Sequence, residues 1–258
     1  MDIIFPMHEP AQIEKTKETF DPIGTNTLEA IARADRFNKW MYETIKPFLL
    51  GSILEIGSGL GNISKFAIKD QLKITLSDFN LDYCRRLEDS FGHHDNVQSV
   101  CSIDLQHPNF CKYYSEYYEK YDTVFLLNVI EHLENDINAI ENCRYMLKPQ
   151  GTLVVLAPAY PYLFSRFDKE LGHYRRYTLK TLSSVIRKNS FELIHKQYFN
   201  LAGLGAWFIF GKVLKRKMIG KGEMSLYNKW VPVFKMVDNI TMKKAGLSAI
   251  VVGKKSEK

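Results

Sequence analysis

Cysteine pairs and a leader-like start are both missing from this sequence. The four cysteines, at positions 84, 101, 111 and 143, include no C-x-x-C pair, which excludes zinc-ribbon and thioredoxin-like sites. The opening residues, MDIIFPMHEP, lack a basic stretch followed by an apolar one, so no secretory signal is predicted. Together these absences favour a cytoplasmic protein whose thiols are reduced.

Long hydrophobic runs are scarce as well. The longest uncharged apolar run, LAGLGAWFIFG at residues 201–211, is too short for a membrane span, which needs about 20 such residues. A basic cluster, KVLKRK, follows it, and an apolar run beside basic residues can lie in a lipid headgroup layer. Residues 201–217 are therefore a candidate for peripheral contact with the inner face of a membrane.

Negative charge is scarce in one segment only. Residues 203–258 hold 12 Lys and Arg against 3 Asp and Glu, while the whole chain carries a formal net charge of +6. This excess favours a partner with negative charge, such as nucleic acid, a phosphorylated substrate or an anionic membrane. A solvated basic surface is the other interpretation.

What the sequence does contain is the composition and periodicity of a globular domain, with 45% hydrophobic and 25% charged residues among 258. Residues 52–158 alternate short apolar strands with helical stretches, which predicts an α/β fold whose mostly parallel sheet has helices on both faces. We expect a single domain with four parts: an N-terminal helical cap (1–50), a ligand-binding core (51–199), a helical insertion acting as a lid (200–247), and a last strand with a tail (248–258).

A glycine-rich turn is the strongest local signal. In ILEIGSGLG, Glu55 lies near the end of the first strand, and Gly57, Gly59 and Gly61 lead into the next helix. Ligands of open α/β sheets bind at the carboxyl ends of the strands, where glycines let the backbone approach closely. The register is G-x-G-x-G, and Asn62 occupies the last position of a dinucleotide fingerprint, which argues against NAD.

Two acids end the next two strands. Asp78 follows the glycine turn at nearly the spacing at which an acid binds ribose hydroxyls; capping the next helix is its alternative role. Asp104 ends the third strand, where its carboxylate would accept a hydrogen bond from an adenine amino group. The neighbouring Ile103 and Leu105 would flank the adenine ring. A loop or cap role is the alternative for Asp104.

The ordered set LEIGSGLG, LSDFN, SIDLQ, NVIEHL and LKPQGTLVVLAP resembles the class I S-adenosylmethionine-dependent methyltransferases over residues 52–158. The resemblance implies a Rossmann-like, seven-stranded sheet, S-adenosylmethionine as cofactor and S-adenosylhomocysteine as product. In the family, the glycine turn holds the methionine part, the second-strand acid the ribose and the third-strand acid the adenine. The implied cofactor-binding residues are Glu55, Gly57, Ser58, Gly59, Gly61, Asp78, Phe79, Asp104, Leu105 and Asn128. The later stretch APAYPYLFSRFDKELGHYRRYTLKTL resembles bacterial methyltransferases of the type 11 and 12 kind, whose acceptor is uncharacterised.

Candidate residues for deprotonating or binding the acceptor come mainly from two segments. His132, just past the fourth strand, and His173 are candidate general bases, with hydrogen bonding or packing as the structural alternative. Arg175 and Arg176 can clamp a carboxylate or phosphate, or simply belong to a solvated turn. The further predicted acceptor-binding residues are Tyr160, Tyr162 and Trp207.

No metal is predicted. Small-RNA 2′-O-methyltransferases carry a Glu-x-x-Glu-His run after the fourth strand and a later His, which bind a divalent cation. Here Asn128 replaces the first glutamate, while Glu131, His132 and His173 are present.

The leading hypothesis is therefore an S-adenosylmethionine-dependent methyltransferase that acts on a small-molecule or lipid-linked acceptor. One alternative is a nucleic-acid methyltransferase that uses the basic segment against phosphates, although no RNA-binding module is recognisable. The other is a membrane-associated protein that binds the cofactor without turnover.

Overall fold

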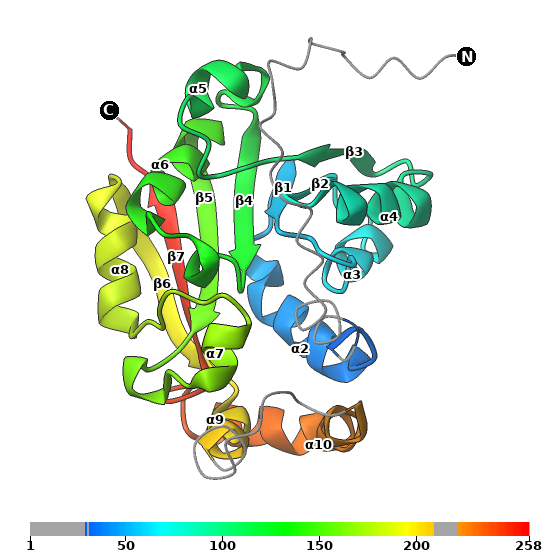
Figure 1. Cartoon of the computed structure of the whole chain (residues 1–258), viewed down its shortest axis with the longest axis vertical. Coiled ribbons are helices and arrows are strands. Elements are labelled where there is room, and N and C mark those ends of the chain that lie inside the picture. The colour runs from blue at the N-terminus through cyan, green and yellow to red at the C-terminus, as the bar shows by residue number, and fades with distance from the viewer. Residues whose placement is uncertain (1–28, 30, 209–220, 258) are drawn as a thin grey trace.

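The computed structural model describes residues 29, 31–208 and 221–257. Its seven-stranded sheet has the order β3-β2-β1-β4-β5-β7-β6 (Figure 1). Strands β1 to β5 are parallel, and β7 runs antiparallel to both β5 and β6. The strands are β1 Ile53–Ile56, β2 Ile74–Asp78, β3 Val97–Ser102, β4 Tyr121–Leu127, β5 Leu147–Pro158, β6 Phe191–Phe199 and β7 Ser248–Lys255. The predicted Rossmann-like, mostly parallel sheet is confirmed.

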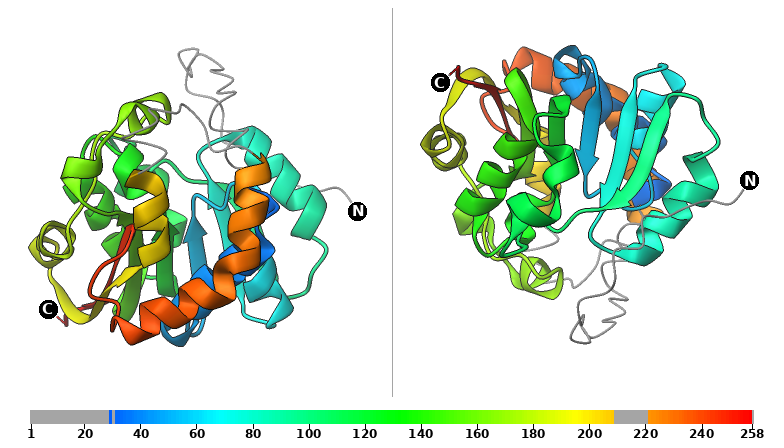
Figure 2. Two further views of the ribbon diagram at one scale, coloured as in Figure 1. Left: turned by 90° about the horizontal axis from the view of Figure 1, so that it is seen from below. Right: turned by 90° about the horizontal axis from the view of Figure 1, so that it is seen from above.

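Helices cover both faces of this sheet (Figure 2). Because β1, β4 and β5 are buried on both sides, two apolar clusters form, one under α5, α6 and α8 and the other under α2, α3, α4 and α10. The helices are α2 Asp35–Ile45, η1 Lys46–Phe48, α3 Ser64–Lys69, α4 Leu81–Phe91, α5 Phe110–Tyr113, η2 Ser115–Tyr117, η3 Ile130–His132, α6 Asp136–Met146, η4 Pro161–Leu163, α7 Arg166–Glu170, α8 Leu179–Lys188, α9 Leu201–Trp207 and α10 Lys221–Ile240.

The strand order places a switch point between β1 and β4, whose crossovers leave in opposite directions along the sheet. In open α/β sheets, ligands bind outside the carboxyl ends of the strands at such a point. Strand β6 ends at this same edge, because Phe199 and the last residue of β5, Pro158, both lie opposite Ser248. Helices α9 and α10 follow β6 and therefore stand at the ligand edge (Figure 1).

The N-terminal helix and the insertion before β7 contact each other, which the sequence did not predict. The backbone N–H of Phe37 in α2 donates to Asn228 Oδ1 in α10 at 3.1 Å, and Lys235 pairs with Glu43 at 2.6 Å. Residues 209–217 of the predicted membrane-contact segment and residues 1–28 of the predicted cap lie outside the described residues. Within the described ranges, no helix is both long and apolar enough to cross a membrane.

Candidate functional site

The turn between β1 and α3 needs its glycines. Gly57, Gly59 and Gly61 have φ values of +72°, +55° and +74°, a left-handed region that costs other residues about 1–2 kcal/mol. A methyl group at Gly57 would overlap Val129 at the end of β4, and one at Gly61 would overlap the ring of Phe91. The backbone of this turn is thus held close to β4, at the edge where a ligand is expected.

Asp78 is bound to this turn. Its Oδ2 accepts a hydrogen bond from the Gly59 N–H at 2.9 Å, and its Oδ1 accepts one from the Asn80 N–H at 2.9 Å. Burial raises the pKa of Asp78, although these hydrogen bonds oppose the shift. The cap of α4 is the Asn80 side chain, which accepts from the Asp82 N–H. The alternative role predicted for Asp78, helix capping, therefore belongs to Asn80. Beside it, Phe79 is 64% exposed.

Asp104 lies further along the same edge. Its Oδ1 accepts a hydrogen bond from the Gln106 N–H at 2.8 Å, and its side chain is partly exposed. Ile103 and Leu105 are packed in the core, 2% and 3% exposed. Little of either side chain reaches the edge where they were expected to flank a ring.

Glu55 lies beneath the glycine turn and is only 4% exposed. The first residue of α3, Ser64, donates its hydroxyl proton to Glu55 Oε2 at 2.5 Å. Burial raises the pKa of Glu55 to about 7, although hydrogen bonds from Ser64 and Ser58 counteract the shift. In this arrangement the hydrogen bond between Glu55 and Ser64 connects β1 to α3 and holds the two ends of the glycine turn together.

The turn after β4 buries a second acid. Asn128 is exposed, has a φ of +54° and donates its N–H to Leu156 O. Glu131, in η3, has no exposed surface, and neither carboxylate oxygen has a hydrogen-bond partner elsewhere in the described chain. Burial raises the pKa of Glu131 to about 8. The Glu131 carbonyl accepts from the Tyr174 N–H at 2.8 Å, which ties the loop after β5 to this turn.

A buried ion pair organises that loop. Asp168 is fully buried, and its Oδ1 accepts from Arg176 Nε at 2.7 Å and lies 3.0 Å from His173 Nδ1. Although burial opposes it, hydrogen bonding to His173 and the charge of Arg176 lower the pKa of Asp168 below its usual value. The Ser165 N–H donates to the other oxygen. No sequence signal had pointed to Asp168.

The position of Arg176 corrects the sequence hypothesis. Its side chain is 2% exposed, it also donates to Ala159 O at 3.2 Å, and it lies 4.2 Å from the ring centre of Trp207. Trp207 in turn packs edge-on against Phe167 at 4.9 Å. Arg176 was expected to contact the acceptor, but here it is buried and joins the loop to α9. Trp207, for which the same contact was predicted, also packs in this junction but stays partly exposed.

Arg175 and the tyrosines are more accessible. Arg175 donates to Glu134 O at 2.6 Å and pairs with Asp136 at 3.1 Å, with a third of its side chain exposed. Tyr160 stacks on Tyr198 with ring centres 5.1 Å apart. Tyr162, next to Tyr160, is 67% exposed. Among the predicted acceptor-side residues outside the histidines, Tyr162 is the exposed one, whereas Arg175, Tyr160 and Trp207 are partly exposed and Arg176 is buried.

The two candidate histidines meet. The rings of His132 and His173 lie edge to face with centres 4.6 Å apart. Ligand atoms of Glu131, His132 and His173 all fall within 4.8 Å of one another. The expectation of no metal rested on Asn128, yet the fold gathers three potential ligands without that position. All three residues were noted from the sequence, but their proximity was not predicted, because His173 lies in the loop after β5, about 40 residues further along the chain than Glu131 and His132.

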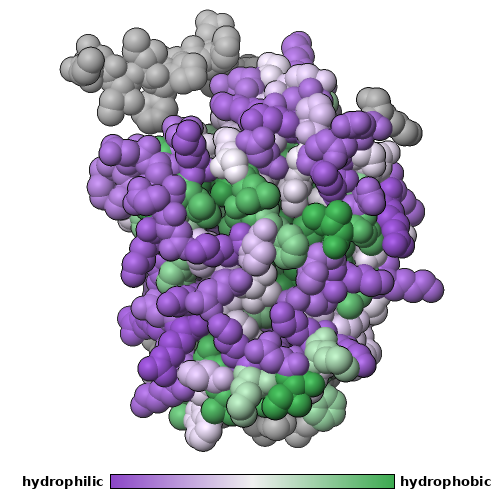
Figure 3. Space-filling view, turned by 180° about the vertical axis from the view of Figure 1, so that it is seen from behind, coloured by the Kyte–Doolittle hydropathy of each residue, from purple (hydrophilic) through white to green (hydrophobic). Residues whose placement is uncertain are grey.

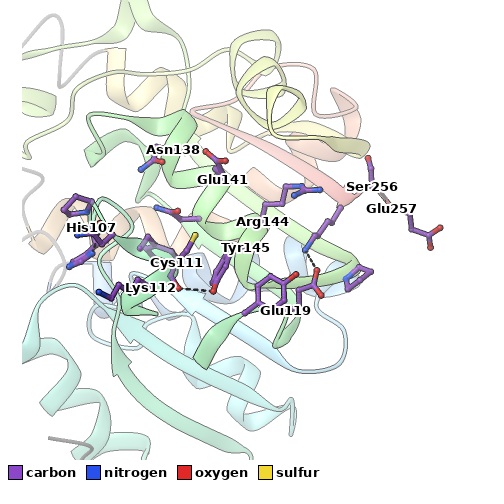
Figure 4. A pocket seen from close by; sticks show the side chains of 17 residues that line it. His107, Cys111, Lys112, Glu119, Asn138, Glu141, Arg144, Tyr145, Ser256 and Glu257 are labelled. Carbon is purple, nitrogen blue, oxygen red and sulfur yellow. Dashed lines mark hydrogen bonds and ion pairs between the residues drawn. The ribbon is translucent and has the colours of Figure 1, made fainter. Parts of the chain in front are cut away.

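The hollow drawn in Figure 4 belongs to another region. It has a volume of about 730 Å³ and is lined by His107, Tyr145, Lys255 and Glu257 among others. Lys255 lies opposite Phe191, the first residue of β6, so the hollow stands at the amino ends of the parallel strands. It is therefore at the edge opposite the glycine turn and the histidines.

Comparison with known proteins points to one family. Residues 54–153 match the family described as "Methyltransferase domain". The chain is 28% identical over 108 residues to a hybrid PKS-NRPS synthetase of Trichoderma harzianum and 28% identical over 105 residues to a ubiquinone biosynthesis O-methyltransferase of Actinobacillus pleuropneumoniae. These matches cover 40% and 39% of this chain but only 3% and 43% of the two relatives, so the chain spans less than half the length of the curated relatives it matches.

Solved structures share the fold. A SAM-dependent methyltransferase from Archaeoglobus fulgidus superposes with a TM-score of 0.55 at 15% identity, covering 84% of this chain and 94% of that one. The phosphoethanolamine N-methyltransferase 2 of Haemonchus contortus, in complex with S-adenosyl-L-methionine, gives 0.55 at 16% identity and covers 83% and 51%.

Proposed function

Because the chain belongs to the class I S-adenosylmethionine-dependent methyltransferases by its fold and its matched domain, we propose that it transfers a methyl group from S-adenosylmethionine to a small-molecule or lipid-linked acceptor. The observation that carries the proposal is the glycine turn after β1, whose Gly59 N–H is bound by Asp78, with Asp104 along the same edge.

The residues at this edge fit the cofactor. The three glycines carry no side chains of their own and have positive φ values, so the turn exposes its backbone, and the carboxylates of Asp78 and Asp104 are acceptors for ribose hydroxyls and an adenine amino group. S-adenosylmethionine supplies an electrophilic methyl group on a positively charged sulfur. The chain's own contribution is to hold donor and acceptor in line, which accounts for much of the rate in such transfers.

A small or lipid-linked acceptor is supported by what surrounds the edge. Helix α10 and the residues after it expose an apolar row, formed by Leu226, Trp230, Val233, Met236, Ile240 and Met242. On the face drawn in Figure 3, hydrophobic side chains lie at this end of the molecule and also across its middle. Lys229 and Lys235 lie on the same helix and are also exposed, a combination that suits an apolar molecule with an anionic group or a membrane surface.

In this proposal the histidines act as the general base that removes a proton from the acceptor. His173 Nδ1 lies against the Asp168 carboxylate, so the Nδ1–H donates there and Nε2 keeps its lone pair. A base oriented in this way by a buried acid is ready to accept a proton.

The test is calorimetry of S-adenosylmethionine with Asp78→Ala. Hydrogen bonds to a charged group contribute about 1.5–3 kcal/mol, so the affinity should fall roughly 10- to 150-fold. Asp82→Ala removes an exposed acid four residues away that pairs only with Arg85 among the described contacts of its side chain, and it should bind like the wild type. Absence of binding to the wild type, or tighter binding of NAD, contradicts the proposal.

A further inference from the structure

Glu131 is a residue of the site whose carboxylate oxygens are left without hydrogen bonds in the described part of the chain. Its carboxylate is fully buried, and neither oxygen has a hydrogen-bond partner elsewhere in the described chain. The positive charge of Arg176 acts on Glu131, but the Arg176 guanidinium is bonded to Asp168. Buried carboxylates without a partner are costly, and native proteins pair them or use them to coordinate metals.

Two histidines lie within reach of this carboxylate. Ligand atoms of Glu131, His132 and His173 are all within 4.8 Å of one another. A cation whose bonds to nitrogen and oxygen are about 2.0–2.2 Å long holds two ligand atoms at most about 4.4 Å apart, so small side-chain rotations bring the three groups onto one ion. His132 is exposed, His173 is partly buried and Glu131 is buried. The cluster is therefore accessible from solvent at His132.

The surroundings orient the cluster as the outer shell of a metal site does. Metal-ligating histidines usually give their second ring N–H to a carboxylate, which fixes the ring and the tautomer. Asp168 has this relation to His173, with 3.0 Å between Oδ1 and Nδ1, and Arg176 holds Asp168 in turn. The hydrogen bond from the Tyr174 N–H to the Glu131 carbonyl holds the two segments together.

We propose that Glu131, His132 and His173 bind one divalent transition-metal cation, and that this cation holds an oxygen atom of the acceptor. With the cation bound, the imidazole lone pairs are coordinated, and the cation's acidifying effect on the acceptor oxygen takes the place of proton removal by the histidines. Two imidazoles with one carboxylate suit zinc or a similar first-row ion and leave an open position. Magnesium and calcium prefer all-oxygen sites. Because Asp168 is neutralised by Arg176, the three ligands carry one negative charge, and the bound cation keeps a positive charge that favours an anionic oxygen. The role toward the acceptor rests on the proposed function, whereas the metal site does not.

The test uses the full chain, stripped of metal by a chelator and titrated with Zn²⁺ or Co²⁺ alone. Co²⁺ reports its coordination through its visible absorption. The wild type should bind about one ion per chain with a low coordination number. Glu131→Gln and His173→Gln should each weaken binding by roughly 100-fold or more. Asp168→Asn removes the charge of the outer partner and also leaves Arg176 without its counter-charge, and it should weaken binding by roughly 10- to 100-fold.

A matched control comes from another histidine pair. His93 and His94 are exposed, with ring centres 4.3 Å apart, so His94→Gln removes the competing surface site and should leave the tight binding unchanged. Equal Co²⁺ affinity of the wild type and Glu131→Gln, or loss of binding with His94→Gln, overturns the metal site. Binding of S-adenosylmethionine, measured on each variant, confirms folding. A protein that binds Co²⁺ through Glu131 but no S-adenosylmethionine refutes the proposed function and leaves the metal site standing.

Discussion

The turns after β1 and β4 each bury a glutamate at the same edge of the sheet, but they treat it differently. Glu55 is 4% exposed and Glu131 has no exposed surface; burial raises the pKa of the first to about 7 and of the second to about 8. Glu55 accepts a hydrogen bond from Ser64, whereas Glu131 accepts none from elsewhere in the described chain. The Glu55 carboxylate is hydrogen-bonded within its own turn. The Glu131 carboxylate keeps both oxygens available for a ligand, as the proposed metal site requires.

The difference follows from where the partners come from. Ser64 is nine residues after Glu55, so the β1 turn is closed by its own local sequence. The neighbours of Glu131 come from the loop after β5, and this loop is held by the Asp168–Arg176 pair. The β4 turn therefore depends on long-range packing, and its variants should affect stability and acceptor chemistry while leaving the β1 turn intact.

The largest effect should come from Asp168→Asn. It leaves the Arg176 guanidinium buried without its counter-charge, and breaking a buried pair in this way costs about 3–5 kcal/mol. Urea unfolding should show this loss, while calorimetry should show S-adenosylmethionine binding within about threefold of the wild type, because Asp78 and the glycine turn are untouched.

Glu170→Gln is the matched control for this variant. Glu170 lies on the same short helix, α7, and pairs with Arg166 at 3.2 Å on the surface, so its loss should cost less than about 1 kcal/mol. Equal costs for the two variants would mean that the loop does not depend on the ion pair.

The next effect compares two glycines, one from each side of the site. Gly61 and Gly172 have nearly the same φ, +74° and +73°, but a methyl group would overlap Phe91 at Gly61 and meets nothing within 4 Å at Gly172. Gly172→Ala should therefore cost only the backbone strain, about 1–2 kcal/mol. Gly61→Ala should cost roughly 1–3 kcal/mol more, from overpacking, and should also weaken S-adenosylmethionine binding.

A second variant separates these two causes. Adding Phe91→Leu to Gly61→Ala removes the aromatic ring, so thermal unfolding should recover most of the difference from Gly172→Ala. If the double variant is as unstable as Gly61→Ala alone, Phe91 is not what makes the glycine necessary.

The sequence predicted the parts of this structure that local patterns determine. The alternation of strands and helices predicted the parallel sheet, and the glycine register predicted the β1 edge, because each of these patterns is complete within a short stretch of sequence. Asp78 was predicted because it follows the glycines at a regular spacing and ends the next strand. Arg176 shows the limit: beside Arg175 it resembled an anion clamp, but it is buried against Asp168 and Trp207. Adjacent residues in a loop alternate between core and solvent, and only the packed loop decides which of them faces a ligand.

The smallest effect tests whether burial raises the pKa of Glu55 despite its hydrogen bonds. Its pKa is about 7 in the folded protein, against 4.5 for a free glutamate. The folded state thus binds the proton more tightly, so the protein should lose stability relative to Glu55→Gln as the pH rises from 4.5 to 7, and the difference should then level off. The two values correspond to at most about 3.4 kcal/mol. Urea unfolding of both proteins between pH 5 and 8 measures this change, with Glu88→Gln, an exposed carboxyl on α4, as the control whose difference from the wild type should stay flat. A flat difference for Glu55→Gln would mean that Ser64 and Ser58 solvate the ionised carboxylate as well as water does, and the contrast with Glu131 would then be larger than burial alone indicates.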